Sequence, residues 1–178
     1  MHLQSAPNTT TTINGKESLF FSGTSYLGVS MFPQFQEQIR KSIGLWGTSY
    51  GSSRSANITL DIYQKGEQYL SSFLNTEDAV TVSSGTLASQ FALNQLEQLV
   101  DDFYFMPKTH PSILPKSAKP VFIKNDIDSE LLNLENKTIC IVTDAIAALE
   151  TGPVSFDFIN DIDKTNTIYF LIDESHSL

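Results

Sequence analysis

The most informative segment of the sequence is Ile168-Tyr169-Phe170-Leu171-Ile172, followed at once by Asp173-Glu174-Ser175-His176. A short, uninterrupted apolar run is typical of a strand buried on both faces of a parallel sheet. In open α/β sheets, ligands bind beyond the carboxyl ends of the strands. The run therefore predicts a buried strand that delivers two carboxylates and an imidazole to the ligand-binding edge of a sheet.

Spacing alone leaves several interpretations of the polar segment open. It could be the metal-holding motif of a helicase-like NTPase, a metal site using Asp173, Glu174 and His176, an Asp and His pair that grips an aromatic cofactor, or simply a helix cap. The sequence has no GxxxxGK[ST] phosphate loop and no second cluster with metal-ligand spacing. These observations count against the first two interpretations, and no metal site is predicted.

Further short apolar runs alternate with helical patterns along the chain. This alternation predicts an α/β fold with a mostly parallel sheet, flanking helices and right-handed crossovers. The predicted strands are residues 79–83, 102–106, 121–123, 138–143 and 167–172. The predicted helices are residues 33–44, 60–74, 88–99, 128–134 and 155–161.

Composition narrows the class of protein. The chain has 178 residues, 40% of them hydrophobic, and a net charge of −9, which disfavours nucleic acid as a partner. The single cysteine, Cys140, excludes an internal disulfide, and no apolar run approaches the roughly 20 residues of a membrane span. We expect a cytoplasmic protein with no membrane partner.

The N-terminal segment differs from the rest. Residues 1–18 are polar and include Thr9-Thr10-Thr11-Thr12, which predicts a loose arm or an edge hairpin. Residues 19–178 are expected to form the α/β domain.

Two further places could contribute to a ligand site at the same edge of the sheet. Ser84, Gly85 and Thr86 follow a predicted strand and open a helix, whose N-terminal N–H groups suit a phosphate, although a plain N-cap explains them equally well. His110 lies in the loop after the strand that ends near Met106, so it could reach the same edge.

Six short motifs in register give a more specific indication than any of them alone. They are Tyr26-Leu27-Gly28, Gly47-Thr48 with Gly51-Ser52-Ser53-Arg54, Asp78-Ala79 leading to Ser83-Ser84-Gly85, Thr109-His110-Pro111-Ser112, Val142-Thr143-Asp144 and Asp173-Glu174-Ser175-His176. In this order they resemble the α-oxoamine synthase family of pyridoxal-phosphate enzymes, which includes 8-amino-7-oxononanoate synthase and glycine C-acetyltransferase. The resemblance covers nearly the whole chain from Phe20.

The resemblance implies a role for each candidate residue toward pyridoxal 5′-phosphate. Ser84, Gly85 and Thr86 would lie at the phosphate, although the family usually has an aromatic residue in place of Thr86. His110 would stack on the pyridine ring, and Asp173 would pair with the protonated ring nitrogen. His176 would hydrogen-bond the phenolic oxygen of the ring.

The sequence also departs from the family pattern. Ala145-Ile146-Ala147-Ala148 stands where the family usually carries a serine, and the glycine-rich loop before Asn57 is shorter. In the family, the Schiff-base lysine lies downstream of the Asp-Glu-x-His motif, whereas all nine lysines here precede it. We therefore expect a truncated fold-type-I large domain, without the lysine segment and the small C-terminal domain, that is catalytically incomplete as written.

An intact relative is expected to be a homodimer that condenses an amino acid with an acyl thioester. Two alternatives remain at this point. An aminotransferase-like enzyme of the same fold would use Asp173 and the phosphate seat equally well. A non-catalytic remnant domain would need no lysine.

Overall fold

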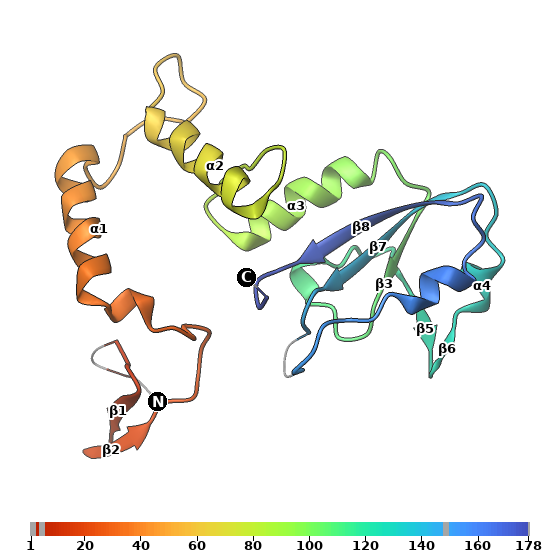
Figure 1. Ribbon diagram of the computed structural model, residues 1–178, viewed down its shortest axis with the longest axis horizontal. Coiled ribbons are helices and arrows are strands. Elements are labelled where there is room, and N and C mark those ends of the chain that lie inside the picture. Colours follow the sequence, from red (N-terminus) through yellow and green to blue (C-terminus); the bar gives the residue numbers. More distant parts are fainter. Residues whose placement is uncertain (1–2, 4–5, 148–149, 178) are drawn as a thin grey trace. The chain divides into compact units, whose positions relative to one another are not determined.

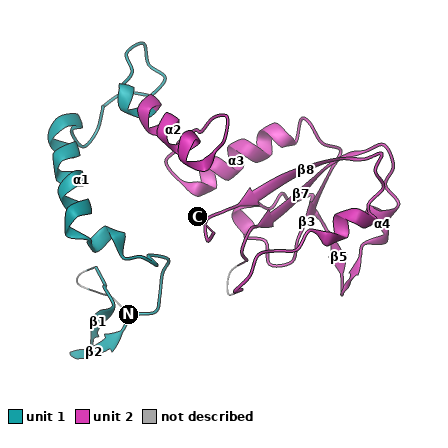
Figure 2. Ribbon diagram, viewed as in Figure 1, with its two compact units in different colours: residues 1–63 teal, residues 64–178 magenta. Residues whose placement is uncertain are grey.

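The computed structural model describes residues 3, 6–147 and 150–177 (Figure 1). The chain forms two compact units, residues 1–63 and residues 64–178, which Figure 2 shows in different colours. The predicted division into an arm of residues 1–18 and a domain of residues 19–178 stays a prediction.

The first unit begins with a β-hairpin. β1 (Thr10–Ile13) pairs antiparallel with β2 (Lys16–Leu19), and Asn14 and Gly15 between them both have positive φ, at 51° and 77°. Two positive φ values are what a tight two-residue hairpin turn requires, and Asn-Gly adopts them readily. Of the two predicted forms of this segment, the hairpin is the one that forms.

Helices complete the first unit and lead into the second. A short 3₁₀-helix (Val29–Met31) precedes α1 (Pro33–Trp46). Proline suits the first position of α1, because the main-chain N–H there has no partner within the helix. α2 (Asp61–Leu74) begins at the end of the first unit and continues into the second. Both helices lie close to the ranges predicted from apolar spacing.

A four-stranded, wholly parallel sheet organises the second unit (Figure 1). Its order is β4-β3-β7-β8. The strands are β3 (Asp102–Phe105), β4 (Lys119–Pro120), β7 (Thr138–Asp144) and β8 (Thr167–Asp173). The predicted α/β class with a parallel sheet is thereby confirmed.

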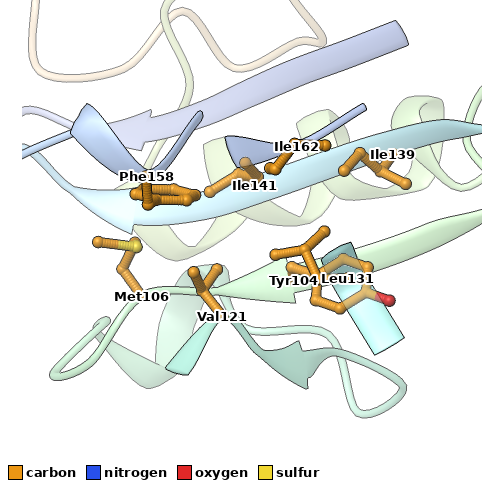
Figure 3. Packing of buried hydrophobic residues seen from close by; sticks show 8 residues of the cluster. All are labelled: Tyr104, Met106, Val121, Leu131, Ile139, Ile141, Phe158 and Ile162. Carbon is orange, nitrogen blue, oxygen red and sulfur yellow. The ribbon is translucent and has the colours of Figure 1, made fainter. Parts of the chain in front are cut away.

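Each face of this sheet carries its own apolar core. Tyr104, Ile139 and Ile141 point to one face, where Leu131 of α4 (Ser129–Leu132), Phe158 and Ile162 pack on them (Figure 3). The remaining buried members of this cluster are Met106 and Val121.

The opposite face is covered by α3 (Gly85–Leu96), which starts a little before the predicted helix of residues 88–99. Leu93 of this helix packs with Phe103, Ile113, Cys140 and Val142. Helices on both faces explain why β7 is apolar without alternation.

Three sequence predictions are wrong in detail. Residues 79–83 form no strand, because a strand needs a neighbour and the main-chain N–H of Thr81 instead donates to the Glu67 carboxylate at 2.6 Å. The predicted strand 121–123 is divided, since β5 (Phe122–Ile123) turns back against β6 (Asp126–Ile127) as a small hairpin. The predicted helix at 155–161 is a 3₁₀-helix over Asp157–Asp161.

None of the helices in the described ranges is both long and apolar enough to cross a membrane.

The buried centre of β7 should dominate stability. Ile141 is fully buried whereas Ile123 is 53% exposed, so the two offer a matched pair. We expect Ile141→Ala to lower the free energy of unfolding by about 2–5 kcal/mol, because it removes transfer energy and leaves a cavity, and Ile123→Ala to lower it by less than about 1 kcal/mol. Urea unfolding followed by circular dichroism measures both, and equal losses would contradict this assignment of the core.

Cys140 offers a direct probe of whether β7 stays closed. It is fully buried, and this burial raises the pKa of its thiol to about 11. Because the thiolate is the reactive form, we expect a thiol-specific reagent at pH 8 to modify the native chain at least roughly a hundredfold more slowly than the urea-unfolded chain. Similar rates in both states would show that β7 opens readily.

Candidate functional site

The candidate site lies where β7 and β8 end. Asp144 and Asp173 are the last residues of these strands and are paired in register. Side chains alternate between faces along a strand, so both aspartates share the face of Cys140 and Val142, which is the face covered by α3. The N–H of Ala145 donates to the carbonyl of Asp173 at 2.8 Å and fixes the two strand ends together.

This edge also contains the point where the strand order reverses. From β3 the chain moves outward to β4 and then returns past β3 to form β7. The crevice outside such a reversal, here between the ends of β3 and β7, is where open α/β sheets bind ligands. The fold therefore favours a ligand site at these two strand ends.

The loop that carries His110 leaves β3 at this end of the sheet and is tied to β7. The Thr109 hydroxyl lies 2.6 Å from the carbonyl of Met106 and 3.3 Å from that of Val142. The main-chain N–H of His110 donates to Oδ1 of Asp144 at 3.1 Å. Lys108 adds an ion pair to Glu150 in the segment after β7.

The ring of His110 is exposed and locally oriented. Its Nδ1 accepts the main-chain N–H of Ser112 at 3.2 Å and lies 2.7 Å from the Ser112 hydroxyl, so His110 caps the short 3₁₀-helix Pro111–Ile113. An Nδ1 that accepts a hydrogen bond places the proton of the neutral ring on Nε2.

The end of β8 presents Asp173 and His176 from a tight turn. Oδ1 of the half-buried Asp173 accepts the N–H of Ser175 at 2.8 Å, and the N–H of Ser177 closes the turn onto the carbonyl of Glu174 at 3.0 Å. Among the described residues, no hydrogen bond reaches Oδ2 of Asp173. This oxygen can therefore accept a hydrogen bond from a ligand. His176 is an exposed member of the same turn.

The N-terminus of α3 is the third part of the candidate site, after the His110 loop and the end of β8. Figure 1 shows α3 beginning at the end of the sheet toward which β7 and β8 point. Ser84 is the N-cap, and its hydroxyl accepts the N–H of Leu87 at 3.2 Å. Gly85 and Thr86 occupy the first two helical positions, where main-chain N–H groups have no partner within the helix. All three residues are exposed, as an anion seat requires.

Asp144 belongs to one of the six motifs, and the sequence alone assigns it no role. Its signal was present, because Asp144 follows a buried strand just as Asp173 does. The alternative metal site finds no support in residues 3, 6–147 and 150–177, where no group of three or more His, Cys, Asp or Glu is placed to hold a metal ion.

Comparison with known proteins identifies relatives of this chain. An 8-amino-7-oxononanoate synthase of Lysinibacillus sphaericus is 26% identical over 177 residues, which are 93% of this chain and 45% of the relative. A serine palmitoyltransferase of Sphingobacterium spiritivorum is 29% identical over 185 residues, 99% of this chain and 46% of the relative. The resemblance to the α-oxoamine synthase family is confirmed.

Solved structures share the fold. A serine palmitoyltransferase from S. paucimobilis with a bound PLP–myriocin aldimine superposes with a TM-score of 0.78 at 20% identity, covering 99% of this chain and 47% of that chain. A Sphingomonas wittichii serine palmitoyltransferase gives a TM-score of 0.63 at 20% identity over 79% of this chain and 38% of its own. No protein-family model matches the chain. The chain spans about half the length of the curated relatives it matches.

The departure from the family pattern after Asp144 is packed into the structure. Ala145 and Ile146 are half-buried and Ala147 is 5% exposed, while Ala148 lies outside the described residues. The N–H of Val154 returns to the carbonyl of Ala145 at 3.0 Å. The described part of this segment therefore offers apolar packing in place of the family's hydroxyl.

The capping role of Ser84 can be separated from any role toward a ligand. Ser84→Ala removes the acceptor of the Leu87 N–H, so we expect the free energy of unfolding to fall by about 1 kcal/mol. Ser84→Asp keeps a capping oxygen and should retain most of the stability. Ser83→Ala, at the exposed neighbouring position, is the control. Urea unfolding measures all three, and a Ser84→Ala variant as stable as the unaltered chain would contradict the cap.

Proposed function

We propose that this chain is the cofactor-binding part of a pyridoxal-phosphate-dependent acyltransferase of the α-oxoamine synthase type, which condenses an amino acid with an acyl thioester. The observation that carries the proposal is the end of β8, where Asp173 stands in register with Asp144 at the reversal point of the strand order. The relatives, an 8-amino-7-oxononanoate synthase and a serine palmitoyltransferase, suggest the reaction class.

The residues present fit pyridoxal phosphate. The ligand combines a dianionic phosphate, a flat ring and a ring nitrogen that carries a proton when paired with a carboxylate. The start of α3 offers main-chain N–H groups and the positive end of the helix dipole to the phosphate. Asp173 offers an oxygen to the ring nitrogen, and the exposed His110 ring offers a flat surface.

When bound, the protonated ring supplies an electron sink for a substrate carbanion. In the proposed site, the Asp173 carboxylate keeps the proton on the ring nitrogen. Ser84, Gly85 and Thr86 bind the phosphate, His110 stacks on the ring, and His176 donates to its phenolic oxygen.

The covalent part of the chemistry lies outside these residues. None of the nine lysines in the sequence follows the Asp173–His176 motif, where the family carries its Schiff-base lysine. We therefore assign binding and orientation of the cofactor, and no covalent role, to the described residues.

The organisation around the site is also part of the proposal. Residues 1–18 form an N-terminal arm and residues 19–178 form part of the large domain of a fold-type-I enzyme. The family builds its site across a subunit interface, so we propose that the intact protein is a homodimer. The single unpaired cysteine, Cys140, fits a reducing cytoplasmic location.

Binding can be tested without the lysine by using pyridoxamine 5′-phosphate, which has an amine in place of the aldehyde. We expect saturable binding to the chain of residues 1–178 in equilibrium dialysis. Asp173→Asn should weaken it by roughly tenfold or more, because it removes a charge-assisted hydrogen bond. Excess inorganic phosphate should compete for the seat at α3.

Asp126→Asn is the matched control, because Asp126 is an exposed carboxylate in the β5–β6 hairpin. It should leave the affinity unchanged. No saturable binding by the unaltered chain, or equal affinities for Asp173→Asn and Asp126→Asn, would overturn the proposed site.

A further inference from the structure

Asp144 is a buried carboxylate to which the proposed cofactor contacts assign no task. It ends β7 and is only 4% exposed. A carboxylate removed from water is expensive unless hydrogen bonds compensate it. Because Asp144 lies where the strand order reverses, its hydrogen bonds show which segments are held at the candidate site.

The hydrogen-bond partner of the Asp144 carboxylate is the main chain of His110. Its Oδ1 accepts the His110 N–H at 3.1 Å from a loop that is 34 residues earlier in the sequence. The other side-chain ties of this loop to the β7 side are weaker anchors. The Lys108–Glu150 ion pair is exposed, and the Thr109 hydroxyl already donates to Met106 within its own loop.

The strand register also places Asp144 next to β8. Asp144 pairs with Asp173 across β7 and β8, and both side chains stand on one face of the sheet. The Asp144 side chain therefore connects the loop after β3 with the end of β7, next to Asp173 of β8. Through the main chain it sets where the His110 ring stands relative to the Asp173 carboxylate.

We infer that Asp144 is a positioning residue, whose carboxylate fixes the His110 loop at the strand end next to Asp173, so that both side chains can contact one flat ring with a protonated nitrogen. The role toward the ligand rests on the proposed function. The hydrogen bond to the His110 N–H is independent of it.

Two substitutions separate the hydrogen bond from the charge and the side-chain shape. In Asp144→Asn, the amide oxygen can accept the same N–H, so positioning is retained without the charge. In Asp144→Leu, the branched shape is kept, at a larger volume, and the acceptor is lost.

Asp128→Leu is the matched control. Asp128 is a second buried aspartate, 8% exposed, that accepts a main-chain N–H, from Glu130 at 3.0 Å. It caps α4, whose Leu131 packs on the opposite face of the sheet. Its loss removes the same kind of hydrogen bond away from the candidate site.

The readouts are the imidazole proton resonances of His110 and the affinity for pyridoxamine 5′-phosphate. The sequence has three histidines, so His110→Gln assigns the signal. Asp144→Asn should keep the resonances and an affinity within about twofold of the unaltered chain. Asp144→Leu should move the resonances toward unfolded-chain values and weaken binding by roughly tenfold, and Asp128→Leu should do neither.

The outcomes are distinguishable. Unchanged His110 resonances and affinity in Asp144→Leu, or the same losses in Asp128→Leu, would overturn the positioning role. If the unaltered chain binds no pyridoxamine 5′-phosphate but Asp144→Leu still moves His110, the hydrogen bond stands and the proposed function falls. If Asp144→Leu does not fold, amide hydrogen exchange of the unaltered chain decides: a protected His110 N–H supports the inference, and unprotected exchange overturns it.

Discussion

The rest of the second unit depends on the burial of β7. Five consecutive residues of this strand, 139–143, are at most 1% exposed, so its main-chain polar groups have no access to water. Buried N–H and C=O groups must be paired, and β7 meets this need with β3 on one side and β8 on the other. This pairing fixes the register of β3 and β8 against β7, and the register determines which residues lie side by side at the ends of the strands.

Carboxylates close the β3–β7 pair at both ends. At its start, Oδ2 of Asp101 accepts the N–H of Thr138 at 2.8 Å, and this hydrogen bond, helped by Lys137, lowers the pKa of Asp101 below its ordinary value. At its end, Asp144 accepts the N–H of His110. The hydrogen bond of Asp101 is exposed to solvent and only stabilises the strand pair. The carboxylate of Asp144, in contrast, is buried and lies next to Asp173 in the sheet. Two adjacent carboxylates at one strand edge favour a cation between them.

Sequence patterns predict those parts of the fold that depend on local composition. The apolar runs of β7 and β8 and the capped start of α3 are visible because burial and capping select residue types directly. Residues 79–83 have the same apolar character but form no strand, since pairing depends on a distant neighbour that periodicity does not report. Asp173 is predictable from its position after a strand. The link from Asp144 to His110 is not, because it joins residues that only the strand order brings together.

The reversal of strand order explains why such a link is needed at this place. Beyond β3 the chain heads for β4 on one side, and beyond β7 it heads for β8 on the other, so the two loops diverge. In open α/β sheets, ligands bind where the loops diverge in this way, and the divergence also leaves the loop main chain without a strand partner. Here the Asp144 carboxylate at the end of β7 supplies the missing acceptor. The strand order that favours a ligand site at this edge therefore also favours a buried acid that holds the His110 loop in place.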